Sequence, residues 1–259
     1  MIKVAVVGCG AIGAPVARAL SSGEVPGARL TGVVDPNGCG ELPRLTLSAA
    51  AGAADLVVEA AGQQALAEAA GPVLDGGARL LVVSVGALRD DALFSRLAAA
   101  GPGRVYLTTG AVGGLDMLRS AARMGPLDKV RIVTTKLPAS LVQPWMGEPQ
   151  AAVLRTATNP VEVKRGPARE IAGLFPASTN VAAAVALAAG AWDLVEAVVM
   201  ADPAAVLTSH VITASGAAGE YRFEIRNKPS AANPKTSGVV PYAVLSAIAD
   251  LAGQPWSFR

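Results

Sequence analysis

Short apolar runs alternate with longer amphipathic or alanine-rich segments along the first 110 residues. The apolar runs have the length of buried strands, and they are Val4–Val7, Leu30–Val34, Leu56–Glu59, Leu80–Ser84 and Val105–Leu107. The segments between them indicate helices, and they are Ala14–Ser22, Thr46–Ala51, Gln64–Leu74 and Asp90–Ala99. Strands that alternate with helices in this way predict an α/β fold with a parallel, doubly wound sheet.

The pattern changes after residue 110. Val130–Lys136 is typical of a strand, and the apolar segment Asn180–Met200 predicts one long helix. Val206–Ala214 and Glu220–Asn227 are joined by a short turn bounded by glycines, and the second run alternates between apolar and charged residues. Two such runs predict a β-hairpin with one solvated face. We therefore expect a smaller α+β domain with a mostly antiparallel sheet over residues 111–235.

The last part of the chain predicts one more helix, Ser237–Leu251. This helix is short and apolar, so we expect it to pack back on the first domain rather than to form a third one. The expected division is 1–110, 111–235 and 236–259.

Composition narrows the kinds of partner. Hydrophobic residues make up 52% of the 259 residues, charged residues 16%, and the net charge is +2. No basic cluster is interleaved with aromatic residues, so we expect no nucleic-acid partner. The longest apolar stretch, Val181–Trp192, is shorter than the roughly 20 residues that span a bilayer, so we expect no membrane segment.

Cys9 and Cys39 fit neither a disulfide framework nor a metal-ligand spacing, which predicts a reduced cytoplasmic location and no metal site.

A glycine-rich turn directly follows the first predicted strand. Gly8, Gly10 and Gly13 have the G-x-G-x-x-G spacing, and a helix begins behind them. The first glycine permits a tight turn, the second lets a pyrophosphate approach the backbone, and the third lets helix and strand pack closely. Ala11 and Ile12 lie where the amide groups of the helix N-terminus would meet the phosphates. The turn predicts a dinucleotide-binding Rossmann domain.

Asp35 ends the second predicted strand, 22 residues after Gly13. A carboxylate at this position accepts hydrogen bonds from the adenosine ribose and repels a 2′-phosphate. Arg44 lies close enough in sequence to help bind such a phosphate. The expected cofactor is therefore NAD or NADP, with NAD slightly favoured.

His210 is the only histidine in the chain. A lone histidine on a strand is often a half-buried residue hydrogen-bonded to a neighbour. The chain offers few other side chains for proton transfer near neutral pH, so we predict a catalytic role for His210. Asn180, which opens the predicted long helix, is either a helix cap or a residue that holds a carboxamide or an anion.

Polar residues before the last predicted helix form a candidate substrate site. Thr236 and Ser237 are plausible N-caps, and with Asn233 they would also bind a substrate carboxylate. Lys136, at the end of its strand, is either a solvated charge or a second cation for the substrate.

These segments together resemble the L-aspartate dehydrogenase family over nearly the whole chain. The resemblance rests on Gly8–Gly13, Val58–Ala65, Ser84–Leu88, Thr109–Asp116, Phe175–Ala183, Ala201–Pro203 with His210, Asn227–Ser230 and Asn233–Ser237. It implies that His210 is catalytic and that Ala111 and Asn180 contact the nicotinamide. It also implies a homodimer and the oxidative deamination of L-aspartate through iminoaspartate, which feeds NAD biosynthesis.

The expected mechanism is reversible hydride transfer between nicotinamide C4 and the α-carbon of a small dicarboxylic amino acid. His210 would be the general base for the water that attacks the imine and the general acid in the reverse direction. Two alternatives remain at this stage. One is a related two-domain reductase that acts on another imino or semialdehyde acid, and the other is a non-catalytic NAD(P)-binding sensor.

Overall fold

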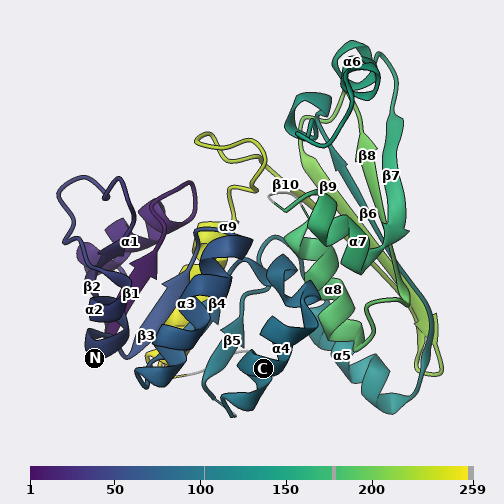
Figure 1. The fold of residues 1–259 in the computed structure, drawn as a ribbon. Helices are drawn as coiled ribbons and strands as arrows, with labels where there is room; N and C mark the ends of the chain where they lie inside the picture. The colour runs from purple at the N-terminus through teal and green to yellow at the C-terminus, as the bar shows by residue number, and fades with distance from the viewer. Residues whose placement is uncertain (102, 177–178, 256–259) are drawn as a thin grey trace. The chain divides into compact units, whose positions relative to one another are not determined.

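In the computed structural model, the strands of the first 110 residues form one parallel sheet in the order β2-β1-β3-β4-β5 (Figure 1). The strands are β1 (Ile2–Val7), β2 (Ala28–Val34), β3 (Leu56–Glu59), β4 (Arg79–Val82) and β5 (Val105–Leu107). The helices are α1 (Gly13–Ser21), α2 (Leu47–Ala53), α3 (Gln63–Asp75), the 3₁₀ helix η1 (Val85–Arg89), α4 (Asp91–Ala99) and α9 (Val240–Leu251). The predicted doubly wound parallel sheet is confirmed.

The structure describes residues 1–101, 103–176 and 179–255. Residues 177 and 178, in the family-like segment before Asn180, and residues 256–259, at the end of the predicted C-terminal segment, lie outside the described part. The chain divides into two units. Unit 1 comprises residues 1–110 and 240–259, and unit 2 comprises residues 111–239.

Unit 2 contains a mixed sheet in the order β10-β9-β6-β8-β7. The strands are β6 (Leu127–Lys136), β7 (Val161–Pro167), β8 (Val195–Ala201), β9 (Thr208–Gly216) and β10 (Gly219–Asn227). Among the described strand pairs of unit 2, only β6–β8 is parallel, so the predicted mostly antiparallel sheet is confirmed. The helices are α5 (Leu115–Met124), η2 (Pro138–Ser140), α6 (Glu148–Thr156), α7 (Ala168–Leu174) and α8 (Asn180–Ala189).

The predicted long helix Asn180–Met200 is wrong in its second half. Helix α8 ends at Ala189 because Gly190 adopts a left-handed conformation with φ 72°, and Val195–Ala201 forms strand β8. Most residues of β8 are buried. Apart from Glu196, β8 is a continuous apolar run, and periodicity alone does not separate such a run from a buried helix.

The last helix also begins later than expected. Helix α9 starts at Val240, not at Ser237, and residues 236–239 group with unit 2. Within unit 1, α9 packs against α1.

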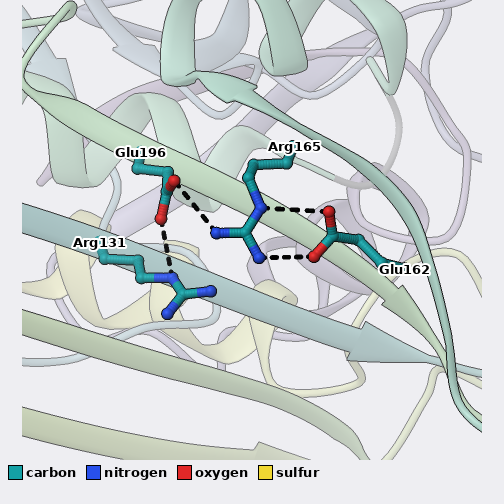
Figure 2. Close-up of polar contacts among 4 residues, drawn as sticks. All are labelled: Arg131, Glu162, Arg165 and Glu196. Carbon is teal, nitrogen blue, oxygen red and sulfur yellow. Dashed lines mark hydrogen bonds and ion pairs between the residues drawn. The ribbon is translucent and has the colours of Figure 1, made fainter.

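The two faces of the unit 2 sheet differ in what covers them. Helices α7 and α8 pack on one face through β6 and β8, and α5 packs on α8 (Figure 1). The opposite face carries a chain of ion pairs (Figure 2). There Glu196 forms ion pairs with Arg131 at 2.9 Å and with Arg165 at 3.1 Å, and Arg165 also pairs with Glu162 at 2.6 Å. The polar residues of β6 and β9 on the helix-covered face are buried, whereas the four ion-paired residues of the opposite face are part-exposed or exposed.

Truncating the core of this sheet tests its contribution to stability. Ile212 is fully buried in β9, so Ile212→Ala should lower the free energy of unfolding by about 2–5 kcal/mol through lost burial and a residual cavity. Urea denaturation followed by circular dichroism measures this change. Val206→Ala, at a side chain that is 82% exposed, should stay within about 0.5 kcal/mol of the parent. Equal midpoints for both variants would contradict the assigned core.

Candidate functional site

The glycine-rich turn of unit 1 joins β1 to α1 and leaves no room for a side chain at two of its glycines. A Cβ atom at Gly13 would lie 1.9 Å from the Gly8 carbonyl oxygen, and one at Gly8 would lie 2.8 Å from the Cα of Ala61. Gly8 also has φ 95°, which favours glycine. At Gly10, by contrast, a Cβ would have no described atom within 4 Å other than those of Gly10 and its two chain neighbours. The turn is therefore closed where strand and helix meet and open where a pyrophosphate would approach.

Ala11 and Ile12 lie between this opening and α1. Ile12 is the N-cap residue, and its side chain makes no capping hydrogen bond. Amide groups at the first turn of a helix need acceptors, and a phosphate supplies them together with a favourable charge. The residues present fit a dinucleotide, as the sequence predicts.

Asp35 is held firmly at the end of β2. One carboxylate oxygen accepts from the Cys9 amide at 2.8 Å, and the other accepts from the Asn37 amide at 2.8 Å. The guanidinium of Arg44 donates to the Pro36 carbonyl at 2.6 Å, which ties it to the same loop. The loop thus carries an acceptor for ribose hydroxyls and a nearby cation for a 2′-phosphate.

The expectation that the two cysteines are unpaired is wrong in this structure. Cys9 and Cys39 form a disulfide, with their Cα atoms 5.6 Å apart. The two residues are 30 positions apart in sequence, yet one follows β1 and the other lies in the loop after β2. Since β1 and β2 are parallel neighbours, their carboxyl ends meet, and so do the segments that follow them. The disulfide therefore links the glycine-rich turn to the Asp35 loop.

Glu59 is a fully buried carboxylate at the end of β3. It accepts hydrogen bonds from the amides of Ala61 and Gly62, and from both the amide and the hydroxyl of Ser84, at 2.9–3.0 Å. Burial raises the pKa of Glu59, while these donors act in the opposite direction. Glu59 thereby joins the loops that follow β3 and β4 at the same edge of the sheet as the glycine-rich turn.

The candidate catalytic residues gather at one edge of the unit 2 sheet. At this edge β6 ends with Lys136, β8 ends with Ala201, β10 ends with Asn227, and β9 begins with Thr208. His210 pairs in register with Thr134 of β6, and Thr134 Oγ1 lies 3.0 Å from His210 Nδ1. Both side chains are on the helix-covered face, with His210 1% exposed and Thr134 3% exposed.

Burial decides the charge of these groups. The pKa of His210 is lowered to about 3, first by burial and then by the positive charge of Lys136, so its ring is neutral at neutral pH. Lys136 is itself 4% exposed, and burial together with the charge of Lys235 lowers its pKa to about 8. Below that pH Lys136 is a buried cation, and no salt bridge to a described carboxylate is found for it.

The segment Asn233–Ser237 forms a turn beside Lys136. Lys136 Nζ donates to the Lys235 carbonyl at 2.6 Å. Within the turn, the Asn233 side chain accepts from the Lys235 amide, and the Asn233 carbonyl accepts from the Thr236 amide. Ser237 is buried, and because α9 begins at Val240, neither Thr236 nor Ser237 is its N-cap. The predicted substrate residues of unit 2 are thus brought together, although not at a helix terminus.

Ala111 lies in a loop and Asn180 in a helix. The Asn227 side chain donates to the Ala111 carbonyl at 2.8 Å, so the loop that contains Ala111 is fixed to the end of β10. Asn180 is the first residue of α8, and the N-cap position is taken by Thr179. Because α8 returns to the start of β8 through residues 190–194, its N-terminus points back toward the edge where β8 ends.

Thr134 and Asn227 were not singled out as site residues by the sequence. Thr134 lies in an ordinary strand pattern, and its role depends on a register partner 76 positions away. Asn227 was included only in a family-like segment. Among the residues that the structure describes, no group of three or more histidine, cysteine or acidic side chains is arranged to hold a metal ion. In the same residues no helix has the length and apolar character needed to cross a membrane.

Comparisons with known proteins agree with both units. Residues 116–251 match the family model "Aspartate dehydrogenase, C-terminal", and residues 8–102 match "Homoserine dehydrogenase, NAD binding domain". An L-aspartate dehydrogenase of Pseudomonas aeruginosa is 38% identical, and one of Cupriavidus taiwanensis is 39% identical; each alignment covers 97% of this chain and 98% of the relative. The crystal structure of an aspartate dehydrogenase from Thermotoga maritima shares the fold with a TM-score of 0.74 at 24% identity, with both chains fully covered. The chain therefore belongs to the L-aspartate dehydrogenase family.

Proposed function

We propose that this protein catalyses the reversible NAD(P)-dependent oxidative deamination of L-aspartate, through iminoaspartate, to oxaloacetate and ammonia. The observation that carries the proposal is the edge of the unit 2 sheet. There the buried His210 contacts Thr134 of β6, and the buried cation Lys136 of the same strand donates to the Asn233–Ser237 turn. A dicarboxylate substrate needs a cation and hydrogen-bond donors for its carboxylates, and this edge supplies both. The alternatives of another reductase or a non-catalytic sensor are not favoured by the family relationship.

Unit 1 binds and orients the cofactor in this proposal. Gly10, Ala11 and Ile12 would contact the pyrophosphate, Gly8 and Gly13 shape the turn, and Asp35 would hold the adenosine ribose. When bound, the nicotinamide supplies the site that accepts or donates the hydride. Ala111 and Asn180 of unit 2 are proposed to contact the nicotinamide, supported by the hydrogen bond from Asn227 that fixes the Ala111 loop.

Unit 2 handles the substrate. Lys136, Asn233, Thr236 and Ser237 would hold a carboxylate, since Lys136 and the turn are joined by a hydrogen bond and are already in place. His210 is proposed to act on the oxygen atom that bonds to the α-carbon when iminoaspartate is hydrated. The same oxygen leaves the α-carbon in the reverse direction. The wider proposal includes a cytoplasmic homodimer that supplies iminoaspartate to NAD biosynthesis.

The activity is tested with purified protein, oxaloacetate, ammonia and NADH or NADPH, by following loss of reduced-nicotinamide absorbance. Turnover is expected, and L-aspartate with the oxidised cofactor should run the reaction backward. His210→Ala should lose on the order of 100-fold or more in kcat while binding NADH as the parent does. Efficient turnover of another imino or semialdehyde acid with none of oxaloacetate would replace the proposed substrate, and NADH binding without any turnover would favour a sensor.

The cofactor preference is tested at Asp35. Because a carboxylate accepts from the ribose and repels a 2′-phosphate, Asp35→Ser should raise the Kd for NADH and lower the Kd ratio of NADPH to NADH by about tenfold or more. Fluorescence titration of each cofactor measures this. Asp55→Ser is the matched control, because Asp55 also accepts from a backbone amide, that of Lys3, but at the opposite edge of the same sheet. An unchanged ratio in Asp35→Ser would remove Asp35 from the cofactor site.

The charge of Lys136 predicts how dicarboxylate binding depends on pH. Lys136 is protonated below its pKa of about 8, and its positive charge is lost as the pH rises through that value. The inhibition constant of succinate, a non-reactive dicarboxylate, should therefore rise between about pH 7 and about pH 9.5. Lys136→Met should weaken succinate on the order of 10- to 100-fold at low pH and abolish the pH dependence, through loss of a charged hydrogen bond of about 1.5–3 kcal/mol.

Lys129→Met is the matched control for this titration, since Lys129 is an exposed lysine near the start of the same strand. It should keep the parent's affinity and pH profile. If Lys136→Met binds succinate as the parent does, Lys136 is a structural residue and not a substrate cation.

A further inference from the structure

Thr134 and His210 form a buried polar pair on the helix-covered face of the unit 2 sheet. They face each other across the β6–β9 pairing, and Ile225 of β10 lies opposite His210 on the other side. The separation of 3.0 Å between Thr134 Oγ1 and His210 Nδ1 is that of a hydrogen bond. Among the described residues, no other partner of the Thr134 hydroxyl is found.

The direction of this hydrogen bond follows from counting donors. A threonine hydroxyl has one proton, and a neutral imidazole has one N–H donor and one acceptor nitrogen. If Nδ1–H donated to Thr134, the buried hydroxyl proton would have no acceptor, which typically costs about 1–3 kcal/mol. If the hydroxyl donates to Nδ1, the hydroxyl proton and the Nδ1 lone pair are both satisfied. The second arrangement places the ring proton on Nε2.

We infer that Thr134 is a positioning residue whose hydroxyl donates to His210 Nδ1 and fixes the neutral ring with its proton on Nε2. Burial and the nearby charge of Lys136 act in the same direction, because both oppose formation of the positively charged ring. His210 then presents a donor, and not a lone pair, at its other nitrogen.

The inference deepens the proposed function, on which its catalytic consequence rests. A neutral histidine with Nε2–H donates a hydrogen bond to the oxygen on the α-carbon, which is the carbonyl oxygen of the 2-oxo acid in amination. This donor polarises the carbonyl for attack by ammonia, and in the reverse direction it stabilises the same oxygen. The role replaces the general base expected from the sequence, since a ring in this tautomer has no free lone pair for a water proton.

The tautomer can be measured directly because His210 is the only histidine among the 259 residues. Ring-¹⁵N-histidine labelling of the full chain, prepared without a histidine tag, gives imidazole signals from this residue alone. Long-range ¹H–¹⁵N correlations near neutral pH should show a protonated Nε2 and an unprotonated Nδ1. A protonated Nδ1 as the main form, or a doubly protonated ring, would overturn the inference.

Substitutions at Thr134 separate positioning from packing. Thr134→Val keeps the shape of the side chain without its hydroxyl, so the Nε2–H signal pattern should give way to mixed tautomers, and kcat should fall about 10- to 100-fold with NADH affinity unchanged. Thr134→Ser restores the hydroxyl and should restore both the tautomer and most of kcat. Thr135→Val, on the next residue and the opposite face, is the control and should match the parent in both measurements.

The outcomes keep the two proposals apart. If the parent shows Nε2–H but does not turn over oxaloacetate, the proposed function fails and the tautomer assignment stands. If Thr134→Val keeps both the parent's tautomer and its kcat, Thr134 is not a positioning residue, whatever the substrate. If Thr134→Val fails to fold, the spectrum of the parent and the kcat and tautomer of Thr134→Ser decide the question. Loss of the Nε2–H form in the serine variant would contradict the role of the hydroxyl.

Discussion

Strand β6 is the element on which the chemistry of unit 2 depends. It pairs in parallel with β8 on one side and antiparallel with β9 on the other, so Thr134 and Lys136 face the same helix-covered surface as His210. A shift of one residue in either register would move these side chains to the opposite, part-exposed face. The charge states follow from this placement, because burial favours the neutral imidazole of His210 and lowers the pKa of Lys136.

The sequence predicted best what is local. Strand, glycine turn and helix are contiguous in residues 2–21, and each glycine has a steric reason that spacing alone makes visible. The pairing of Cys9 with Cys39 was missed because it depends on β1 and β2 being neighbours, which is a property of strand order. The roles of Glu59 in joining two loops and of Asn227 in fixing Ala111 likewise depend on segments that meet only in the folded chain.

Unit 2 was predicted less completely because its burial hides its periodicity. Strand β8 is apolar except for Glu196 and was read as part of a helix, although Gly190 marks the boundary. His210 was singled out because it is unique, but its partner Thr134 required the β6–β9 register. Thr236 and Ser237 were expected to cap a helix that begins only at Val240, so their proposed role now depends on the turn around Asn233.

The two units contribute differently to specificity. The glycine turn and Asp35 are features common to many dinucleotide-binding proteins, so they indicate the class of cofactor and little about the substrate. Lys136 is different, because a buried ammonium that the described structure provides with one carbonyl acceptor destabilises the free protein. A substrate carboxylate would compensate that charge. Part of the binding free energy would then come from removing the desolvation penalty that the buried ammonium carries in the free protein. Burial and, second to it, the same positive charge keep His210 neutral, which links recognition of an anionic substrate to the protonation state of the residue proposed to act on it.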